Sequence, residues 1–139
     1  MNKNNVNQML ASLQERAISG DVQSQYLYGT ICRQSGRYAE AVRWIEMAAQ
    51  QNQVNAQYDL GLMYARGTGV AQNFSMATKW LKKAAEQGHD GAQYMLAVCY
   101  NEGLGVPKDL LKAVSWLKKS AAQGNQDAIA DLKDFFNIR

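Results

Sequence analysis

The sequence predicts an all-α solenoid built from helix-turn-helix repeats, and three observations support this fold class. Two consecutive stretches of 36 residues, 56–91 and 92–127, share one pattern, in register and without a gap. Apolar residues inside each stretch follow helical spacing, and the chain holds a single Pro among many Ala, Leu, Gln, Lys and Met residues. Units that repeat at such an interval stack on their neighbours to bury a continuous core.

The repeat organises the whole chain into one domain. Trp44, Trp80 and Trp116 recur at the 36-residue interval, and the register also extends upstream into a first unit that is four residues shorter. Internal units bury their apolar faces against neighbours on either side, so half-units at the two ends act as caps. We predict about eight helices, arranged as a half-repeat at 5–22, full repeats at 23–54, 55–90 and 91–126, and a C-terminal half-repeat at 127–139.

Each internal unit is predicted to be two helices joined by a glycine-rich turn. Ala56 and Leu60 begin a series at i, i+4, i+7 and i+8 that lies on one helical face, and residues 77–85 repeat this spacing. Gly67 permits the positive φ that ends the first helix, and Gly88 ends the second in the same way.

Small residues occupy one position in the first helix of each unit, where Gly29, Gly61 and Ala97 align. A larger side chain there would hold the second helix away, because helix axes in contact lie about 8–10 Å apart and the near end of that range needs small residues. We therefore predict a close helix crossing at this position, with the repeated tryptophans filling the seam between successive units.

The repeated residues also carry a family resemblance. The pattern A-Q-Y-x-L-G-x-M-Y-x-x-G-x-G-V, followed by A-x-x-W-L-x-K-A-A-x-Q-G, resembles the Sel-one-like repeat (SLR) family, an α/α solenoid class related to tetratricopeptide repeats (TPR). The first unit departs from this pattern, because it lacks the G-x-G-V turn and has Cys32 where Tyr64 and Tyr100 repeat. The resemblance implies a right-handed superhelix whose first helices line a concave face, and an adaptor function.

Residues of the first helices that remain after the core is assigned form a ladder across the units. A tyrosine recurs at one position, and mixed polar and apolar residues follow it on the same stripe. Aromatic residues edged by polar groups are typical of protein-binding surfaces, with Tyr and Arg as anchors. The residues predicted to bind a partner on the concave face are Tyr26, Thr30, Arg33, Gln34, Tyr58, Leu62, Arg66, Tyr94, Val98, Asn101 and Glu102.

The tyrosines among these residues have a second interpretation. A tyrosine repeated at a fixed position more often packs between repeats than contacts a ligand. The non-repeating positions are better candidates, because the scaffold does not dictate their residue type. These positions are Thr30, Arg33, Gln34, Leu62, Arg66, Val98, Asn101 and Glu102.

Composition excludes several other classes of protein. A net charge of +3 without a basic stripe argues against nucleic-acid binding, and no stretch has the length or apolar character of a membrane span or a secretion signal. Two cysteines in units two repeats apart, Cys32 and Cys99, are too few and too distant for a disulfide framework. We predict a cytoplasmic protein in which both cysteines are small core residues.

Catalytic chemistry is not predicted. No zinc-binding HExxH motif, nucleotide-binding glycine loop or nucleophile elbow is present, so no cofactor, catalytic residue, metal ligand or small-molecule substrate is assigned. His89 is expected to be a solvated residue of the turn after Gly88. The pairs 82–83 and 118–119, all lysines, are expected to form a solvated outer face that points away from the Trp and Ala residues.

The sequence therefore predicts a non-enzymatic module that binds a protein or peptide partner on its concave face. Two alternatives stay open. The small size also fits bacterial solenoids of this family that serve as immunity or antitoxin proteins against a cognate effector. A hydrolase-like or ligand-binding activity, suggested for cysteine-rich members of the family, is less well supported because their paired cysteines are missing here.

Overall fold

The computed structural model describes residues 2–137, and side chains up to residue 135. This part of the chain forms eight α-helices and no strands. The helices are α1 (Lys3–Ile18), α2 (Val22–Gln34), α3 (Tyr38–Gln50), α4 (Val54–Arg66), α5 (Phe74–Glu86), α6 (Asp90–Glu102), α7 (Leu110–Ala122) and α8 (Gln126–Asn137).

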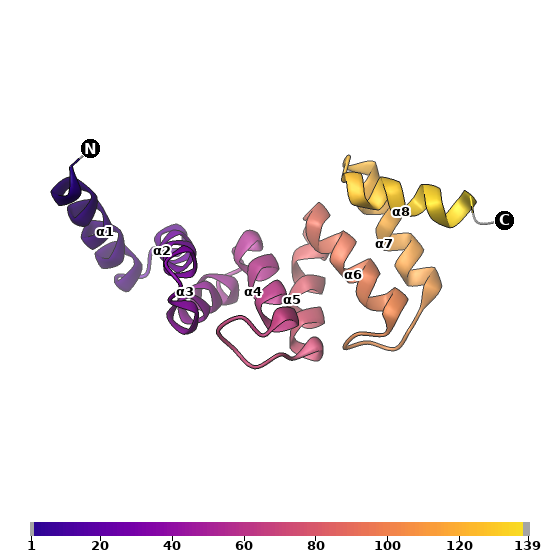
Figure 1. Ribbon diagram of the computed structural model, residues 1–139, viewed down its shortest axis with the longest axis horizontal. Helices are drawn as coiled ribbons and strands as arrows, with labels where there is room; N and C mark the ends of the chain where they lie inside the picture. The colour runs from indigo at the N-terminus through magenta and orange to yellow at the C-terminus, as the bar shows by residue number, and fades with distance from the viewer. Residues whose placement is uncertain (1, 138–139) are drawn as a thin grey trace.

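Each helix packs mainly against the helix before it and the helix after it. The pairs α2–α3, α4–α5 and α6–α7 make the most extensive contacts and form three helix-turn-helix repeats, with α1 and α8 as single helices at the ends. The row of helices is curved, and α1 and α8 rise at its two ends (Figure 1). The predicted all-α solenoid is therefore confirmed.

The starts of the three first helices are fixed by side-chain caps. The residue before the first helix of each repeat accepts a hydrogen bond from the backbone N–H three residues later; this residue is Asp21, Gln53 or His89. The cap satisfies one of the backbone donors that a helix start leaves without a partner. For His89 the bond runs from the N–H of Ala92 to Nδ1 at 3.0 Å. The expectation that this histidine is a solvated turn residue is therefore wrong, because its ring caps α6.

The helix ends confirm the predicted glycine turns. Gly67 and Gly103 end α4 and α6 with φ of 69° and 72°, in the left-handed region that glycine adopts without strain. The second glycine of the G-x-G turn is needed for space as well. A Cβ on Gly105 would lie 2.1 Å from the carbonyl oxygen of Phe74, at the start of the preceding repeat's second helix. The turn thus packs directly on the backbone of the neighbouring repeat.

The close crossing predicted within each repeat is also confirmed. A Cβ on Gly29 would lie 2.7 Å from Cγ1 of Ile45, and a Cβ on Gly61 would lie 2.8 Å from Cγ of Leu81. Both distances are shorter than real carbon contacts, so only glycine allows α2–α3 and α4–α5 to approach as they do. Ala97, which takes this position in α6, is buried.

A buried glutamine in each first helix joins successive helices. Nε2 of Gln57 donates to the carbonyl of Ala49 at 3.2 Å, and its Oε1 accepts from Nε2 of Gln87 at 2.8 Å. The equivalent pairs, Gln51 to Gln25 and Gln123 to Gln93, have distances of 2.7 and 2.9 Å. The Gln of the A-Q-Y pattern therefore has a structural role. Its amide ties its own helix to the end of the preceding second helix and to the glutamine that follows its own second helix.

The two cysteines are free and buried, as expected of core residues.

The outer lysines differ from expectation, because Nζ of Lys83 lies 4.8 Å from the centre of the Trp80 ring and Nζ of Lys119 lies 4.4 Å from that of Trp116. The expectation that these side chains point away from the tryptophans is wrong for these two. Ammonium groups at this distance are attracted to the indole face.

Over residues 2–137, none of the helices has both the length and the hydropathy that a bilayer span requires.

Candidate functional site

All eleven predicted binding residues belong to α2, α4 and α6, the first helices of the three repeats. We call the partly exposed side of these helices, together with α8, the first-helix face. Three junctions follow one another along this face, from α2 to α4, from α4 to α6 and from α6 to α8. The predicted residues gather at these junctions in three groups that differ in chemistry.

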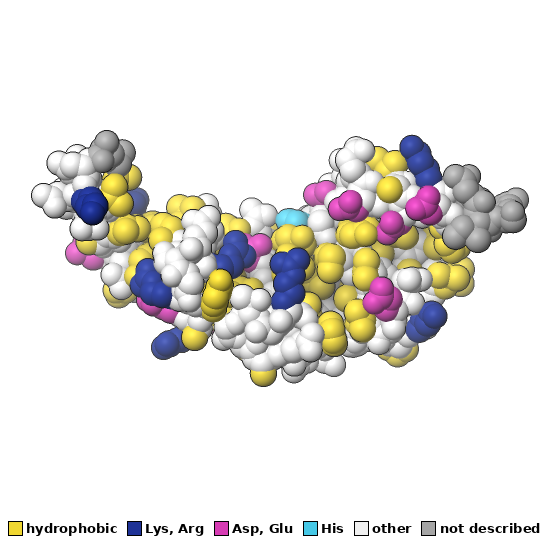
Figure 2. Space-filling view, in the orientation of Figure 1, with side chains coloured by type: hydrophobic (Ala, Val, Ile, Leu, Met, Phe, Trp, Pro, Cys, Tyr) yellow, Lys and Arg dark blue, Asp and Glu magenta, His cyan; other side chains and the backbone are white. Residues whose placement is uncertain are grey.

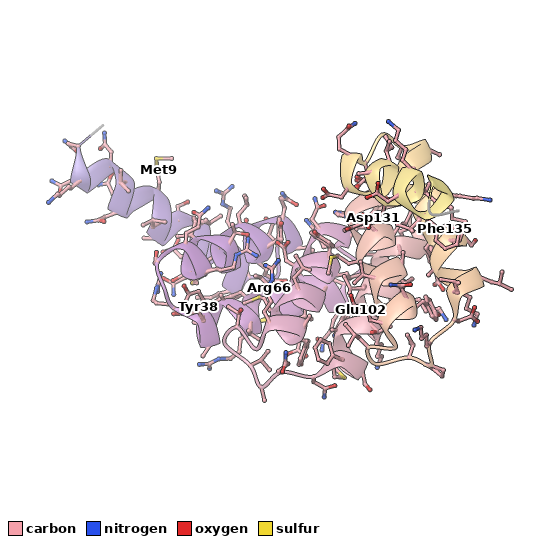
Figure 3. The ribbon with its side chains drawn as sticks, turned by 45° about the vertical axis from the view of Figure 1, so that its right-hand side comes forward. Met9, Tyr38, Arg66, Glu102, Asp131 and Phe135 are labelled. Carbon is pink, nitrogen blue, oxygen red and sulfur yellow. The ribbon has the colours of Figure 1, made fainter. Side chains whose placement is uncertain are left out.

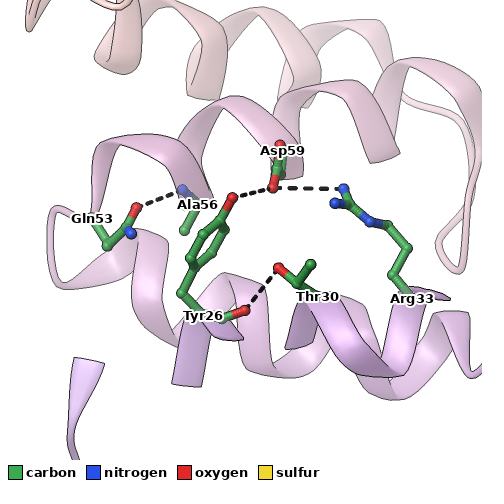
Figure 4. Close-up of polar contacts among 6 residues, drawn as sticks. All are labelled: Tyr26, Thr30, Arg33, Gln53, Ala56 and Asp59. Atoms are coloured by element: carbon green, nitrogen blue, oxygen red, sulfur yellow. Dashed lines mark hydrogen bonds and ion pairs between the residues drawn. The ribbon is translucent and has the colours of Figure 1, made fainter. Parts of the chain in front are cut away.

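The first group surrounds Asp59, whose side chain is almost buried (Figure 4). The hydroxyl of Tyr26 donates to Oδ2 of Asp59 at 2.7 Å, and Nη1 of Arg33 lies 3.6 Å from the same oxygen. Thr30 donates to the carbonyl of Tyr26 at 3.0 Å. We call the bond from a first-helix tyrosine to an aspartate two helices further along the chain a Tyr–Asp clasp. Gln34, the fourth predicted residue of α2, is exposed.

The clasp changes the acidity of its tyrosine. Burial, the hydrogen bond to Asp59 and the negative charge of that carboxylate together raise the pKa of Tyr26 to about 12. Burial favours the neutral phenol because it disfavours any charged form. The hydrogen bond and the carboxylate favour it because ionisation of the phenol would place two anions side by side. Tyr26 is thus held as a hydrogen-bond donor to its own protein.

The second group lies at the junction of α4 and α6 and has no clasp. Met95 takes the repeat position that Asp59 has in α4, so the hydroxyl of Tyr58 has no hydrogen-bond partner among the described residues. Its ring stacks instead on His89, with ring centres 4.4 Å apart and planes 25° from parallel. Leu62 is half-buried on the same helix, and Arg66 is exposed in its last turn without an ion pair in the described part of the chain.

The third group lines a groove of about 400 Å³ between α6, α7 and α8. Two of its lining residues form a second clasp, in which the hydroxyl of Tyr94 donates to Oδ2 of Asp131 at 3.0 Å. As for Tyr26, burial comes first among the causes that raise the pKa of Tyr94 to about 12, followed by its aspartate partner. The groove is lined by Tyr94, Ala97, Val98, Asn101, Glu102, Leu117, Asp131, Asp134 and Phe135.

Charge is unevenly distributed over this surface. Acidic side chains gather over the α6–α8 end of the view in Figure 2. Figure 3 shows Glu102, Asp131 and Phe135 at the same end of the molecule, with Arg66 nearer the middle. Position 66 in one repeat corresponds to position 102 in the next, so equivalent places on the first-helix face carry opposite charges.

Sequence reasoning missed the acidic partners of the tyrosines and the contribution of α8. Asp59 and Asp131 share one repeat position, three residues after the aligned Ala56 and Ala128, which is a signal that could have identified them. Asp134 and Phe135 had no such signal. They enter the groove only because α8 packs beside α7.

The protein-family model described as Sel1 repeat matches residues 22–53, 54–89 and 91–125 of the chain. The chain belongs to the Sel1 repeat family. Each matched Sel1 repeat covers one first helix and one second helix and includes one of the three aligned tyrosines, whereas Asp131 lies in α8, beyond the last matched residue. Sel1 repeat proteins are typically protein-interaction scaffolds.

Solved structures of Sel1 repeat proteins resemble the chain over most of its length. A Sel1 repeat protein from Oxalobacter formigenes is 40% identical, with a TM-score of 0.81, and the match covers 90% of this chain and 97% of that one. The protective antigen c5321 from uropathogenic Escherichia coli, which displays an SLR fold, is 29% identical with a TM-score of 0.68. That match covers 88% of this chain and 35% of the antigen.

A third structure supports the Sel1 repeat fold alone. Cysteine rich protein B from Helicobacter pylori is 20% identical, with a TM-score of 0.66, and the match covers 91% of this chain and 92% of that protein. The comparison with curated proteins found no match.

Proposed function

We propose that this Sel1 repeat protein is a non-enzymatic interaction module that holds a peptide or protein segment against the inner, first-helix face of the curved chain. The observation that carries the proposal is the third group of residues. Four of the predicted residues, Tyr94, Val98, Asn101 and Glu102, lie along one groove that combines aromatic, aliphatic and charged side chains. Such a mixture is typical of protein-binding surfaces.

The neighbouring repeat supports the same role. Leu62 offers a partly exposed apolar surface, and the guanidinium of Arg66 is exposed without an ion pair in residues 2–137. Arginine and aromatic side chains are frequent energetic centres of interfaces. Tyr26 and Arg33 are engaged with Asp59, so we assign them to the junction between repeats. The hydroxyl of Tyr94 is engaged with Asp131 in the same way, and only its ring, which lines the groove, is assigned to the partner.

The test is capture of a partner by the wild type and by the triple variant Leu62→Ala, Arg66→Ala and Glu102→Ala. None of these side chains is fully buried, so the variant is expected to keep the helicity and melting temperature of the wild type. Immobilised protein is incubated with extract of the source cells, and bound proteins are cross-linked and compared. A partner of the first-helix face is retained by the wild type and lost from the variant.

A matched control likewise removes one apolar, one basic and one acidic side chain, here from the second helices. Arg43, Met47 and Glu86 are exposed on α3 and α5, and the variant Arg43→Ala, Met47→Ala and Glu86→Ala should retain the partner. If both triple variants retain the partner equally, binding does not use the first-helix face. If only the control loses it, the interaction surface lies on the second helices.

A further inference from the structure

The groove between α6, α7 and α8 has an apolar base and an acidic edge. Val98 and Leu117 are half-buried, and Ala97 beneath them is buried. The carboxylates of Glu102, Asp131 and Asp134 stand around these apolar residues. Among the residues whose side chains the structure describes, the lining includes no lysine and no arginine.

These three carboxylates are not neutralised within the described residues. The ion pairs there join Arg33 to Asp59, Arg37 to Glu40 and Lys82 to Glu86. Asp131 accepts a hydrogen bond from Tyr94, but a neutral phenol leaves the charge of the carboxylate in place. Like charges gathered at one groove repel each other, and a cationic side chain that enters between them relieves this repulsion.

We propose that this groove binds an arginine-containing segment of the partner in which the arginine stands next to an aliphatic residue. The proposal rests on the proposed function and names the chemistry of its partner. The aliphatic side chain covers Val98 and Leu117, while the guanidinium pairs with a carboxylate at the acidic edge, which Glu102, Asp131 and Asp134 provide.

The aromatic lining favours arginine over lysine. Tyr94 and Phe135 present rings at the same groove as the carboxylates. A planar guanidinium can stack on a ring while its edge donates two hydrogen bonds to a carboxylate, and an ammonium group cannot do both in this way. Leucine or isoleucine beside the arginine matches the apolar base.

Two other ligand classes fit the groove less well. The phosphates of a nucleic acid would meet three carboxylates of the same sign. A metal ion needs ligands close together, and within the described part of the chain no group of three or more His, Cys, Asp or Glu side chains could hold one. A basic, partly apolar peptide segment matches both the negative charge and the apolar base of the groove.

The experiment uses three synthetic peptides and ¹⁵N-labelled protein. The test peptide is Gly-Ser-Arg-Leu-Arg-Leu-Arg-Ser-Gly. The second peptide replaces each arginine by glutamate, and the third replaces each leucine by serine. Binding is followed by amide chemical shifts at increasing peptide concentration. The test peptide should shift residues of α6 and α8, the serine peptide should bind more weakly, and the glutamate peptide should not bind.

Charge is then tested on the protein side. The variant Glu102→Gln, Asp131→Asn and Asp134→Asn keeps side-chain size and should weaken binding of the test peptide at least about tenfold. The matched control, Glu15→Gln, Glu46→Gln and Glu86→Gln, removes three carboxylates from α1, α3 and α5 and should bind like the wild type. Raising the salt concentration from about 50 to about 300 mM should weaken wild-type binding and leave the variant nearly unaffected.

Each contrary result has a distinct meaning. Equal affinity of wild type and acid variant overturns the inference. Shifts confined to α2 and α4 also overturn it, although they leave the first-helix face as a binding surface. Absence of any shift with the test peptide overturns the inference too, while the capture experiment with the Leu62, Arg66 and Glu102 variant still judges the proposed function separately.

Discussion

The hydroxyl of Tyr26 donates a hydrogen bond to Oδ2 of Asp59 at 2.7 Å and thereby joins the first helices of two successive repeats. Tyr94 makes the same bond to Asp131 at 3.0 Å. Tyr58, which lies between them in the repeat register, has no such acceptor because Met95 replaces the aspartate. One tyrosine position therefore has two different roles in the same molecule.

The first prediction compares these tyrosines by removal of the hydroxyl. Tyr26→Phe should lower the free energy of unfolding by about 1–2 kcal/mol, because a hydrogen bond to a carboxylate is lost and Asp59 keeps only its contact with Arg33. Tyr58→Phe should change it by less than about 0.5 kcal/mol, since no hydrogen bond is removed. Urea denaturation at pH 7 measures both. Equal losses in the two variants would contradict the clasp.

The second prediction concerns stability at high pH. The pKa values of Tyr26 and Tyr94 are raised to about 12 in the folded protein, against about 10 in an unfolded chain. A raised pKa means that the clasps stabilise the fold fully below about pH 10 and lose this contribution as the pH rises towards 12. The urea midpoint should therefore fall more steeply above pH 10 for the wild type than for Tyr26→Phe with Tyr94→Phe. Parallel curves for the two proteins would rule the effect out.

The third prediction uses the close crossing of α4 and α5. Glycine to alanine in a helix interior normally stabilises by about 0.5–1 kcal/mol. Gly61→Ala should instead destabilise by about 1–3 kcal/mol, because the new Cβ would lie 2.8 Å from Cγ of Leu81. The reverse change at the same repeat position, Ala97→Gly, should cost only about 1 kcal/mol. The melting temperature of each variant shows whether the change stabilises or destabilises the fold. A Gly61→Ala protein that melts at a higher temperature than the wild type refutes the close crossing of α4 and α5.

The fourth prediction separates the two contributions of His89. His89→Ala removes both the cap of α6 and the stack on Tyr58, so the free energy of unfolding should fall by about 1–2 kcal/mol. His89→Asn should recover part of this loss, because Asn125 caps the next first helix from the same repeat position. Urea denaturation of both variants provides the measurement. If the asparagine variant is as unstable as the alanine variant, the cap contributes nothing.

The fold could be predicted because its determinants recur at a fixed interval. Gly61 and Gly67 each have a single structural reason, a close crossing and a positive φ, and both reasons can be inferred from residue type and position. The helices follow from apolar spacing in the same way. Local rules of this kind do not depend on how one repeat is oriented against the next.

The candidate site could be predicted only in part, because it depends on how one repeat is oriented against the next. Tyr26 and Tyr94 were recognised as a repeating position, but whether they bind a partner or pack depends on which residue of the next first helix lies opposite. Asp59 and Asp131 look like ordinary surface acids in the sequence. The cap that His89 provides is hard to predict for a related reason, since its role is clear only when His89 is compared with Asp21 and Gln53 at the starts of the other first helices.

The missing clasp at the middle junction has a mechanical consequence. A hydrogen bond of 2.7 or 3.0 Å holds two helices at a fixed distance and angle, whereas stacked rings such as those of Tyr58 and His89 can slide over each other at little cost. We therefore expect the junction between α4 and α6 to bend more readily than the two junctions that have a clasp, although the turn at Gly105 also packs on the backbone of Phe74 there. Bending at this junction would change the span from Arg66 to Glu102 and with it the curvature of the first-helix face.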